Sequence, residues 1–386
     1  MSSLKYWIWL SSLSGIGSVT AVKLINHFGS PEKVFEARNF EYRDVDGVST
    51  ADAVVLAEKN LDGANSALAS CTRLGYRILT LHDAEYPDRL RNIYDPPIVL
   101  YIRGGLPLVD EEAVVSIVGT RNCTPYGISA AENLGYTLAK HGLVVSTGLA
   151  RGIDTAAARG ALKGGGRVVG VVGSGLDIVY PYENRELFEG VAASGAIVSE
   201  YKPGAPAVRT HFPARNRIVS GLSLGVAVIE APKRSGALIT ASRALEQGRD
   251  VFVIPGNIDA RSCEGSNALL REGAIPILSG EDIVSEYTEL FPDKIHDPAS
   301  FDCDKKGIDN NSAVDYIDLD KILSELVGDE RSVAQAIGLE SVHIDEITVK
   351  TGMTAQRVMT ALTMLEVNGA ASQKTGKRFS LNRRNE

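Results

Sequence analysis

Short apolar segments rich in β-branched residues alternate with longer helical segments through most of this chain, and this alternation constrains the fold more than any other feature. Segments such as "AVVSIVG" (113–119) and "RVVGVVG" (167–173) are apolar almost throughout rather than at every second position. Continuous apolar runs are typical of strands that helices cover on both faces. The sequence therefore predicts an α/β fold with a doubly wound, mostly parallel, extended Rossmann-like sheet.

The apolar segments predict nine strands within a core of residues 66–290. Helical stretches such as "PYGISAAENLGYTLAKHG" lie between most of them. In an open parallel sheet, ligands bind beyond the carboxyl ends of the strands, so the residues that follow each strand form the candidate site. The expected strands are residues 76–81, 98–104, 113–119, 143–148, 167–173, 196–200, 224–231, 250–256 and 275–278.

Residues 1–65 have helical character and no strand pattern. The segment "LSGIGSVTAVKLI" has the glycine spacing of a helix-hairpin-helix or SAM-like domain, in which a tight turn and a helix N-terminus contact phosphate. A weaker copy follows at 45–58. Because the segment is not basic, a plain turn between two helices is an equally good interpretation.

The end of the chain predicts a linker and a small separate domain. Residues 291–315 are polar and acidic, as in a linker. Residues 316–386 have the helix, turn, helix and two-strand order of a winged helix, with basic residues in the wing at Lys374, Lys377 and Arg378. The predicted recognition helix has only Arg357 as a positive charge, so this domain could bind DNA, bind protein or serve a structural purpose.

Composition narrows the classes of protein. The 386-residue chain has a formal net charge of −8 and a pI near 5.4, which argues against nucleic-acid binding by bulk charge but allows a local cationic groove. No apolar run approaches the roughly 18–20 residues that span a bilayer, and no signal peptide is evident, so we expect a cytoplasmic protein without a membrane partner. Four scattered cysteines without a C-x-x-C pair predict neither disulfides nor a metal site.

Common enzyme motifs are missing from the sequence. No G-x-x-x-x-G-K-[ST] loop or G-x-S-x-G elbow occurs, and "GSGLDI" (173–178) has an isoleucine in place of the third glycine of a dinucleotide fingerprint. We therefore expect no cofactor and no catalytic residues.

One segment of this acidic chain is locally cationic. Between residues 205 and 234 five cations stand against Glu230 alone, and they lie between two predicted strands at the expected ligand edge. Phe212 and Asn216 stand among them. Arginines interleaved with an aromatic ring and an amide are typical of grooves for single-stranded nucleic acid, where charge follows the backbone and a ring stacks on a base. The cations are Arg209, Arg215, Arg217, Lys233 and Arg234.

Six segments in unbroken order, from about residue 75 to 285, resemble the DNA-processing protein A family, also called DprA or Smf. The resemblance implies a non-enzymatic protein that binds single-stranded DNA, forms a homodimer and helps to load the RecA recombinase during natural transformation. Both flanking domains also resemble arrangements in that family. The segments are "SIVGTRNCTPYG", "STGLARGIDTAAARGAL", "VVGSGLDIVYPYEN", "HFPARNRIVSGLS", "SGALITASRALEQGRDVFVIPG" and "GSNALLREGA".

The resemblance and the local chemistry together define a candidate DNA site. Family motifs match Arg121, Arg209, Phe212 and Asn216, whereas Tyr182 stands where some members carry a basic residue. From the local charge and glycine turns we add Arg215, Arg217, Lys233, Gly173, Ser174 and Gly175. Arg215 or Arg217 could instead be structural, paired with a carboxylate such as Glu200 or Glu230.

Two other functions remain open from the residues. The glycine turns could hold a nucleotide, as in nucleoside-monophosphate phosphoribohydrolases, with Asp154, Asp177 or Glu230 as the acid at the ribose. Alternatively, the end domains could bind double-stranded DNA while the core serves as a scaffold. For the dimer contact we expect residues 267–278, near the last strand.

Overall fold

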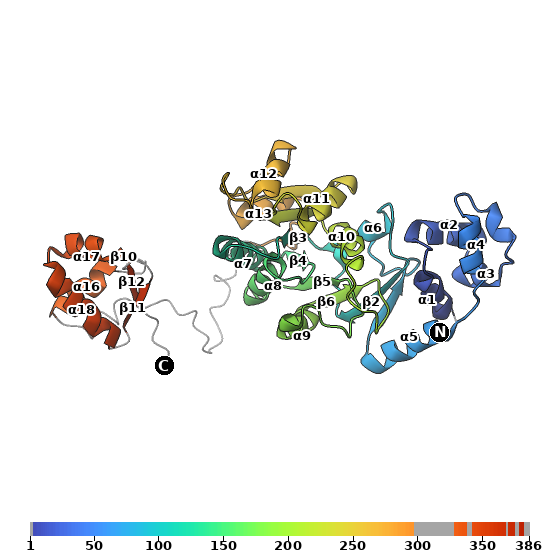
Figure 1. Cartoon of the computed structure of the whole chain (residues 1–386), viewed down its shortest axis with the longest axis horizontal. Helices are drawn as coiled ribbons and strands as arrows, with labels where there is room; N and C mark the ends of the chain where they lie inside the picture. The colour runs from blue at the N-terminus through green and yellow to red at the C-terminus, as the bar shows by residue number, and fades with distance from the viewer. Residues whose placement is uncertain (1–2, 297–327, 338–341, 368–369, 375–377, 382–386) are drawn as a thin grey trace. The chain divides into compact units, whose positions relative to one another are not determined.

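The computed structural model describes residues 3–296, 328–337, 342–367, 370–374 and 378–381 (Figure 1). The chain divides into two compact units, residues 1–304 and 305–386, and each has an apolar core of its own. Most of the expected linker, residues 297–315, lies outside the described residues. Its first part, 291–296, packs on the first unit, where Ile295 is buried and the His296 amide donates to the carbonyl of His141 at 3.0 Å.

All nine strands predicted for the core are present in one sheet. The sheet has the order β1-β2-β6-β5-β4-β3-β7-β8-β9, in which β1, β2 and β6 pair antiparallel and all other neighbours pair parallel. The strands are β1 Arg77–Thr80, β2 Val99–Gly104, β3 Val114–Gly119, β4 Val144–Thr147, β5 Val168–Val172, β6 Ala196–Ser199, β7 Gly225–Ile229, β8 Asp250–Val253 and β9 Ile275–Pro276.

The strand order determines where helices and ligands can lie. From β3 the chain moves outward through β4, β5 and β6, then returns to place β7 on the other side of β3. Because parallel crossovers are right-handed, helices of the two halves cover opposite faces of the sheet, and the direction reverses between β3 and β7. One face carries α7 (Pro125–Lys140), α8 (Ile153–Lys163) and α9 (Arg185–Ser194), and the other carries α10 (His211–Gly221) and α11 (Gly236–Glu246).

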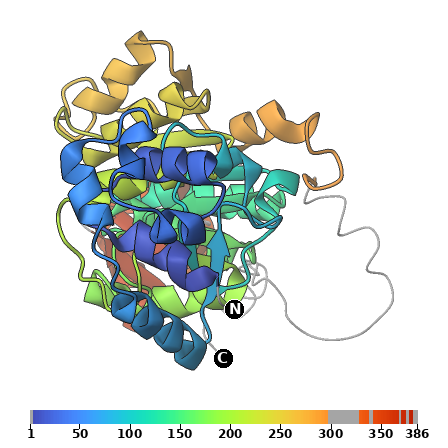
Figure 2. The same cartoon turned by 90° about the vertical axis from the view of Figure 1, so that its right-hand side faces the viewer.

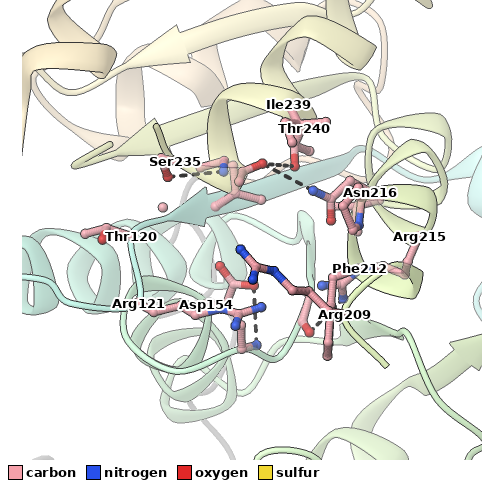
Figure 3. A pocket seen from close by; sticks show the side chains of 18 of the residues that line it. Thr120, Arg121, Asp154, Arg209, Phe212, Arg215, Asn216, Ser235, Ile239 and Thr240 are labelled. Carbon is pink, nitrogen blue, oxygen red and sulfur yellow. Dashed lines mark hydrogen bonds between the residues drawn. The ribbon is translucent and has the colours of Figure 1, made fainter. Parts of the chain in front are cut away.

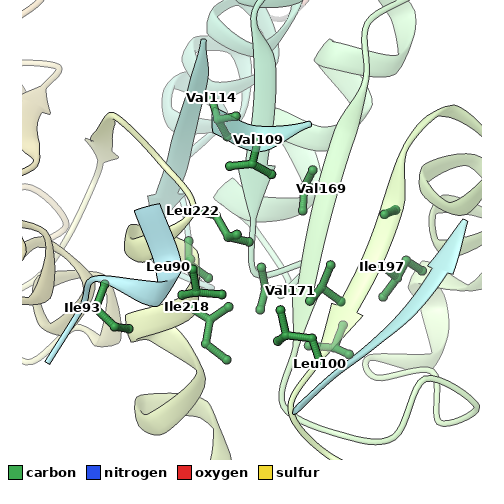
Figure 4. Packing of buried hydrophobic residues seen from close by; sticks show 14 of the residues in the cluster. Leu90, Ile93, Leu100, Val109, Val114, Val169, Val171, Ile197, Ile218 and Leu222 are labelled. Carbon is green, nitrogen blue, oxygen red and sulfur yellow. The ribbon is translucent and has the colours of Figure 1, made fainter. Parts of the chain in front are cut away.

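Apolar side chains fill the space between α10 and the sheet (Figure 4). Ile218 of α10 and Leu222, the residue that follows this helix, are fully buried, and so are Val171 and Leu100 on the strands beside them. Leu90 from the short helix α6 (Asp88–Arg91) joins this cluster. Two more helices, α12 (Glu264–Arg271) and α13 (Gly280–Thr288), complete the first unit after β8. Among the described residues, no helix combines the length and apolar character needed to cross a bilayer.

The N-terminal helices share the core of the sheet. Figure 2 is viewed from their side, and their buried residues belong to the same apolar cluster as the strands. The boundary that we expected at residue 65 falls inside α5. The helices are α1 (Leu4–Ser12), α2 (Ser18–Phe28), α3 (Pro31–Glu36), α4 (Thr50–Leu56) and α5 (Asp62–Leu74).

The glycine-rich turn joins α1 and α2, as the helix-hairpin-helix pattern predicts. Gly15 has a φ of 93°, a left-handed conformation that favours glycine, and α2 follows directly. Ser18, the first residue of α2, contacts Glu200 of the core, with 3.3 Å between its hydroxyl and the carboxylate. The weaker copy corresponds to α4, where Ser49 and Asp52 form a capping box.

The second unit has the helix and strand order predicted for a winged helix. Its sheet has the order β10-β12-β11, and the expected helix near 319–326 lies outside the described residues. Lys377 lies outside them too, and only the backbone is described at Lys374 and Arg378. The elements are α16 (Gly328–Ile337), β10 (Val342–His343), α17 (Ile344–Thr351), α18 (Ala355–Val367), β11 (Ala371–Lys374) and β12 (Arg378–Leu381).

Candidate functional site

A pocket of about 740 Å³ opens at the carboxyl ends of β3, β4 and β7, where the strand order reverses. This is the edge at which open α/β sheets bind ligands. Its wall and floor combine cations with an aromatic ring and amide groups (Figure 3). We call it the arginine pocket and define it by Arg121, Arg209, Phe212, Arg215 and Arg234.

The loop that carries Arg121 is fixed to the end of β7. The Thr120 amide donates to the Glu230 carbonyl at 2.8 Å, and the Glu230 carboxylate accepts from the amide of Thr124 at 2.8 Å and from its hydroxyl at 2.5 Å. A Cβ at Gly127 would lie 2.4 Å from that carboxylate, so the close approach requires glycine. Glu230 therefore holds the loop at the start of α7 and pairs with neither Arg215 nor Arg217.

Helix α10 presents one face to the pocket. Phe212, Asn216 and Val219 lie at i, i+4 and i+7, the spacing of residues on one side of a helix, and all three line the pocket. The Phe212 ring centroid lies 5.1 Å from the guanidinium carbon of Arg121 and 5.5 Å from the ring centroid of Tyr180. The Asn216 amide donates to the Gly236 carbonyl at 3.2 Å, which joins α10 to the start of α11.

Arg215 forms part of the pocket floor and is 4% exposed. Its guanidinium donates to the carbonyls of Gly148, at 2.7 Å, and Val171. A side chain at Gly148 would collide with that guanidinium, since a Cβ there would lie 2.5 Å from it. Burial lowers the pKa of Arg215 to about 10, and the nearby carboxylate of Asp154 opposes the shift. Burial likewise raises the pKa of Asp154, against the effect of Arg215.

Arg217 points away from the pocket into a buried ion-pair network. It lies 2.7 Å from the carboxylate of Glu200 and 3.1 Å from that of Asp95, and it donates to the Ser18 hydroxyl at 3.1 Å. Burial lowers the pKa of Arg217, but Glu200 and Asp95 more than reverse this and the net shift is upward. Of the two carboxylates expected as partners, Glu200 is therefore the one that Arg217 meets.

The expected phosphate-binding turn at residues 173–175 is buried behind the pocket rather than in its lining. The Gly175 amide donates to the Ala205 carbonyl at 2.8 Å, and the Ser174 hydroxyl donates to the Ile178 carbonyl at 3.1 Å. The Gly173 carbonyl lies 3.1 Å from a ring nitrogen of His211. The turn therefore supports the start of α10 and offers no free Gly175 amide to a ligand. Lys233, also expected at the site, lies outside this lining and pairs with Glu264 at 3.5 Å.

The lining includes a cation and an aromatic ring that the sequence does not predict for the site, from Arg234 and Tyr180. Arg234 belongs to the cationic segment, but the sequence predicts its neighbour Lys233 as the site residue. Tyr180 lines the pocket, whereas Tyr182, which stands where some family members carry a basic residue, is 73% exposed and lies outside the lining. Within the described part of the chain, Arg121, Arg209 and Arg234 line the pocket and form no ion pair, although the carboxylate of Asp154 in the same lining acts on Arg121 from a longer distance.

Of the three acids considered for a nucleotide-cleaving enzyme, only Asp154 lines the pocket within the described residues. Glu230 is engaged by Thr124, and Asp177 lies outside the pocket lining, where it accepts from the Gly204 amide at 2.8 Å. Asp154 lines the pocket but is buried at the start of α8. No described geometry brings two of these acids together at one ligand position in the pocket.

Two family models match this chain. The model described as DNA recombination-mediator protein A matches residues 77–288, more than half of the chain, and the model described as DprA winged helix domain matches residues 320–377. The resemblance predicted from the six segments, and the predicted winged helix, are confirmed by these matches.

Related proteins and structures agree with the family models. Protein Smf of Synechocystis is 32% identical over 98% of both chains, and DNA processing protein DprA of Streptococcus pneumoniae is 45% identical over 52% of this chain and 71% of its own. The X-ray structure of the pneumococcal protein has a TM-score of 0.64 at 36% identity, covering 73% of this chain and 97% of that one. A Helicobacter pylori DNA processing protein A structure, described as giving insights into a single-stranded DNA binding mode, has a TM-score of 0.50 at 31% identity, covering 57% and 97%.

Proposed function

The chain belongs to the DNA processing protein A family, and from this premise and the geometry of the arginine pocket we propose that it binds single-stranded DNA during recombination. The observation that carries the proposal is a set of three guanidinium groups without ion-pair partners, from Arg121, Arg209 and Arg234, that line the same pocket as Phe212. These groups face one pocket in a chain whose net charge is −8. Local cations of this kind attract a polyanion to one place on an acidic molecule.

Each part of the pocket has a physical task in this proposal. The exposed guanidinium groups bind phosphates, and Phe212 offers its ring to a base, which requires a strand whose base faces are free. Arg215 is buried and already bonded to two carbonyls, so it supports the floor and adds positive potential without leaving its place. Arg217 and the turn at 173–175 hold α10 in position and do not contact DNA.

A binding titration tests the proposal. Oligothymidylate affinity is measured at two salt concentrations for the wild type, Arg121→Ala and Phe212→Leu. Arg121→Ala should weaken binding and flatten the log–log salt dependence by about 0.7, because one phosphate contact is lost. Phe212→Leu should cost about 1–3 kcal/mol with little change in that slope, because stacking does not release counterions. Unchanged affinity and slope in both variants would refute the pocket as the DNA site.

We propose two further properties from family membership, the loading of RecA onto the bound strand and a homodimer through residues 267–278. The dimer contact has local support, since β9 is the edge strand of the sheet and Leu278 is 87% exposed. Sedimentation of Leu278→Glu tests the dimer, which should dissociate.

The rate of RecA filament assembly on single-stranded DNA, with and without the protein, tests the loading. A rate that the protein leaves unchanged would count against it.

A further inference from the structure

A second hollow of about 590 Å³ lies beside the arginine pocket, along α11. It shares four lining residues with the pocket, so the two hollows meet at the first turn of that helix. In Figure 3 Ser235, Ile239 and Thr240 stand on the wall opposite Arg121 and Asp154. We call the second hollow the α11 groove. The shared residues are Arg234, Ser235, Gly236 and Ile239.

The α11 groove combines cations with apolar side chains. Lys233, Arg234 and Arg243 line it together with Leu238 and Ile239, and Ile239 is 41% exposed. This combination resembles the arginine pocket in kind, with charge for a backbone and apolar surface for bases.

Two of these cations already have carboxylate partners. Lys233 pairs with Glu264 at 3.5 Å and Arg243 with Glu246 at 2.7 Å, and all four side chains are at least 39% exposed. Exposed pairs of this type contribute little to stability and exchange readily, so incoming phosphates can replace the carboxylates. Arg234 forms no ion pair within the described residues.

The junction of the two hollows suits a phosphate. Helix α11 begins there at Gly236, and the hydroxyl of its N-cap Ser235 accepts from the Ala237 amide at 3.2 Å. The positive end of an 11-residue helix and the Arg234 guanidinium thus face the same place.

We propose that the α11 groove is a second subsite for the same DNA strand. The strand continues from the arginine pocket across Ile239, with one phosphate near Arg234 and the start of α11. The next bases pack on Leu238 and Ile239, and Lys233 and Arg243 flank the following phosphates. This inference rests on the proposed function of the arginine pocket, because it assigns the path of the strand that the pocket binds.

The test compares oligothymidylates of about six and about twelve nucleotides, which fall within ordinary site sizes for single-strand binders. The variant is Lys233→Ala with Arg243→Ala, since both residues line the α11 groove and neither lines the arginine pocket. The matched control is Arg77→Ala with Lys163→Ala, which removes two exposed, ion-paired cations outside both linings.

The double variant should bind the short oligomer within about twofold of the wild type. For the long oligomer, the slope of its log–log salt dependence should fall by about 1.4, because two phosphate contacts are lost. The affinity gained by lengthening the strand should fall severalfold in this variant and remain in the control. Ser242→Glu, which places a negative charge at an exposed position of the groove, should have the same selective effect.

Two results would overturn the inference and are distinguishable. If the wild type binds both lengths and the groove variants keep the full gain from lengthening, the strand takes another path and the arginine pocket stands alone. If the wild type binds neither oligomer, the proposed function itself fails, and the second subsite fails with it.

Discussion

Arg215 and Arg217 stand two positions apart on α10, so they project about 200° apart around the helix. Arg215 bonds to carbonyl groups beneath the pocket, whereas Arg217 bonds to Glu200, Asp95 and Ser18 of the N-terminal helices. A cationic segment in a sequence therefore contains residues with different tasks. Arg209, in the exposed loop before the same helix, has its charge free for a ligand.

This difference predicts opposite behaviour of two arginine variants. Arg217→Ala should lower the free energy of unfolding by about 3–5 kcal/mol, because the half-buried carboxylates of Glu200 and Asp95 would lose their buried partner. Arg209→Ala should change stability by no more than about 0.5 kcal/mol while weakening DNA binding. Chemical denaturation and oligomer titration of both variants check this. An Arg217→Ala protein of normal stability that no longer binds DNA would reverse the assignment.

At the scale of elements, the sequence predicts the strands well and the placement of polar residues poorly. The nine apolar runs identify the strands because burial on both faces leaves a local signature in each segment. Glu200 is among the carboxylates expected as partners, but the other two partners of Arg217 have no such signature, since Ser18 is 199 positions away and Asp95 lies before β2. Arg121 was found because its motif matches a family pattern, whereas Tyr180 and Arg234 carry no signal that separates them from their neighbours.

The N-terminal helices enclose a lysine whose behaviour can be predicted from its surroundings. The Lys59 ammonium donates to the Val34 carbonyl at 3.2 Å and to the Tyr42 hydroxyl, and it lies 5.2 Å from the ring of Trp9 and 5.3 Å from that of Phe35. Burial lowers the pKa of Lys59 to about 8, from 10.5 in the unfolded chain. Between these two pH values the unfolded chain binds more protons than the folded chain, so the contribution of Lys59 to the free energy of unfolding rises with pH. The same contribution is lost as the pH falls to about 8.

We therefore expect the unfolding free energy of the wild type, relative to Lys59→Met, to rise between pH 8 and 10.5. The rise should be about 1–2 kcal/mol, less than the full pKa shift would give, because the Lys59 side chain is only partly buried. Denaturant titrations of both proteins at several pH values measure it. Tyr42 is present in both, so its own titration largely cancels. A constant or falling difference would mean that the aromatic rings stabilise the charged form enough to offset burial.

At the scale of the whole molecule, we expect the units that unfold cooperatively to be the two apolar cores, and not the domains whose boundaries the sequence composition predicts. One cluster of buried residues runs from Trp7 to Ile295, and a separate one holds the winged helix. A chain that ends after His296 should therefore unfold as cooperatively as the first unit of the full protein and bind a short oligomer within about twofold as well.

Residues 66–290 alone should behave differently. That fragment cuts α5 within its first turns, removes the Ser18 contact to Arg217 and Glu200, and removes Lys294, which lies 3.3 Å from the buried carboxylate of Glu112. Because these losses expose apolar surface of the shared core, the fragment should unfold at lower denaturant concentration or with a broader transition. Its α10 should then hold Phe212 and Asn216 less firmly, and short-oligomer affinity should fall by more than the loss of any one phosphate contact. Circular dichroism and oligomer titration of the two fragments decide this. A fragment of residues 66–290 with the stability and affinity of the longer one would mean that the sheet folds independently of the N-terminal helices.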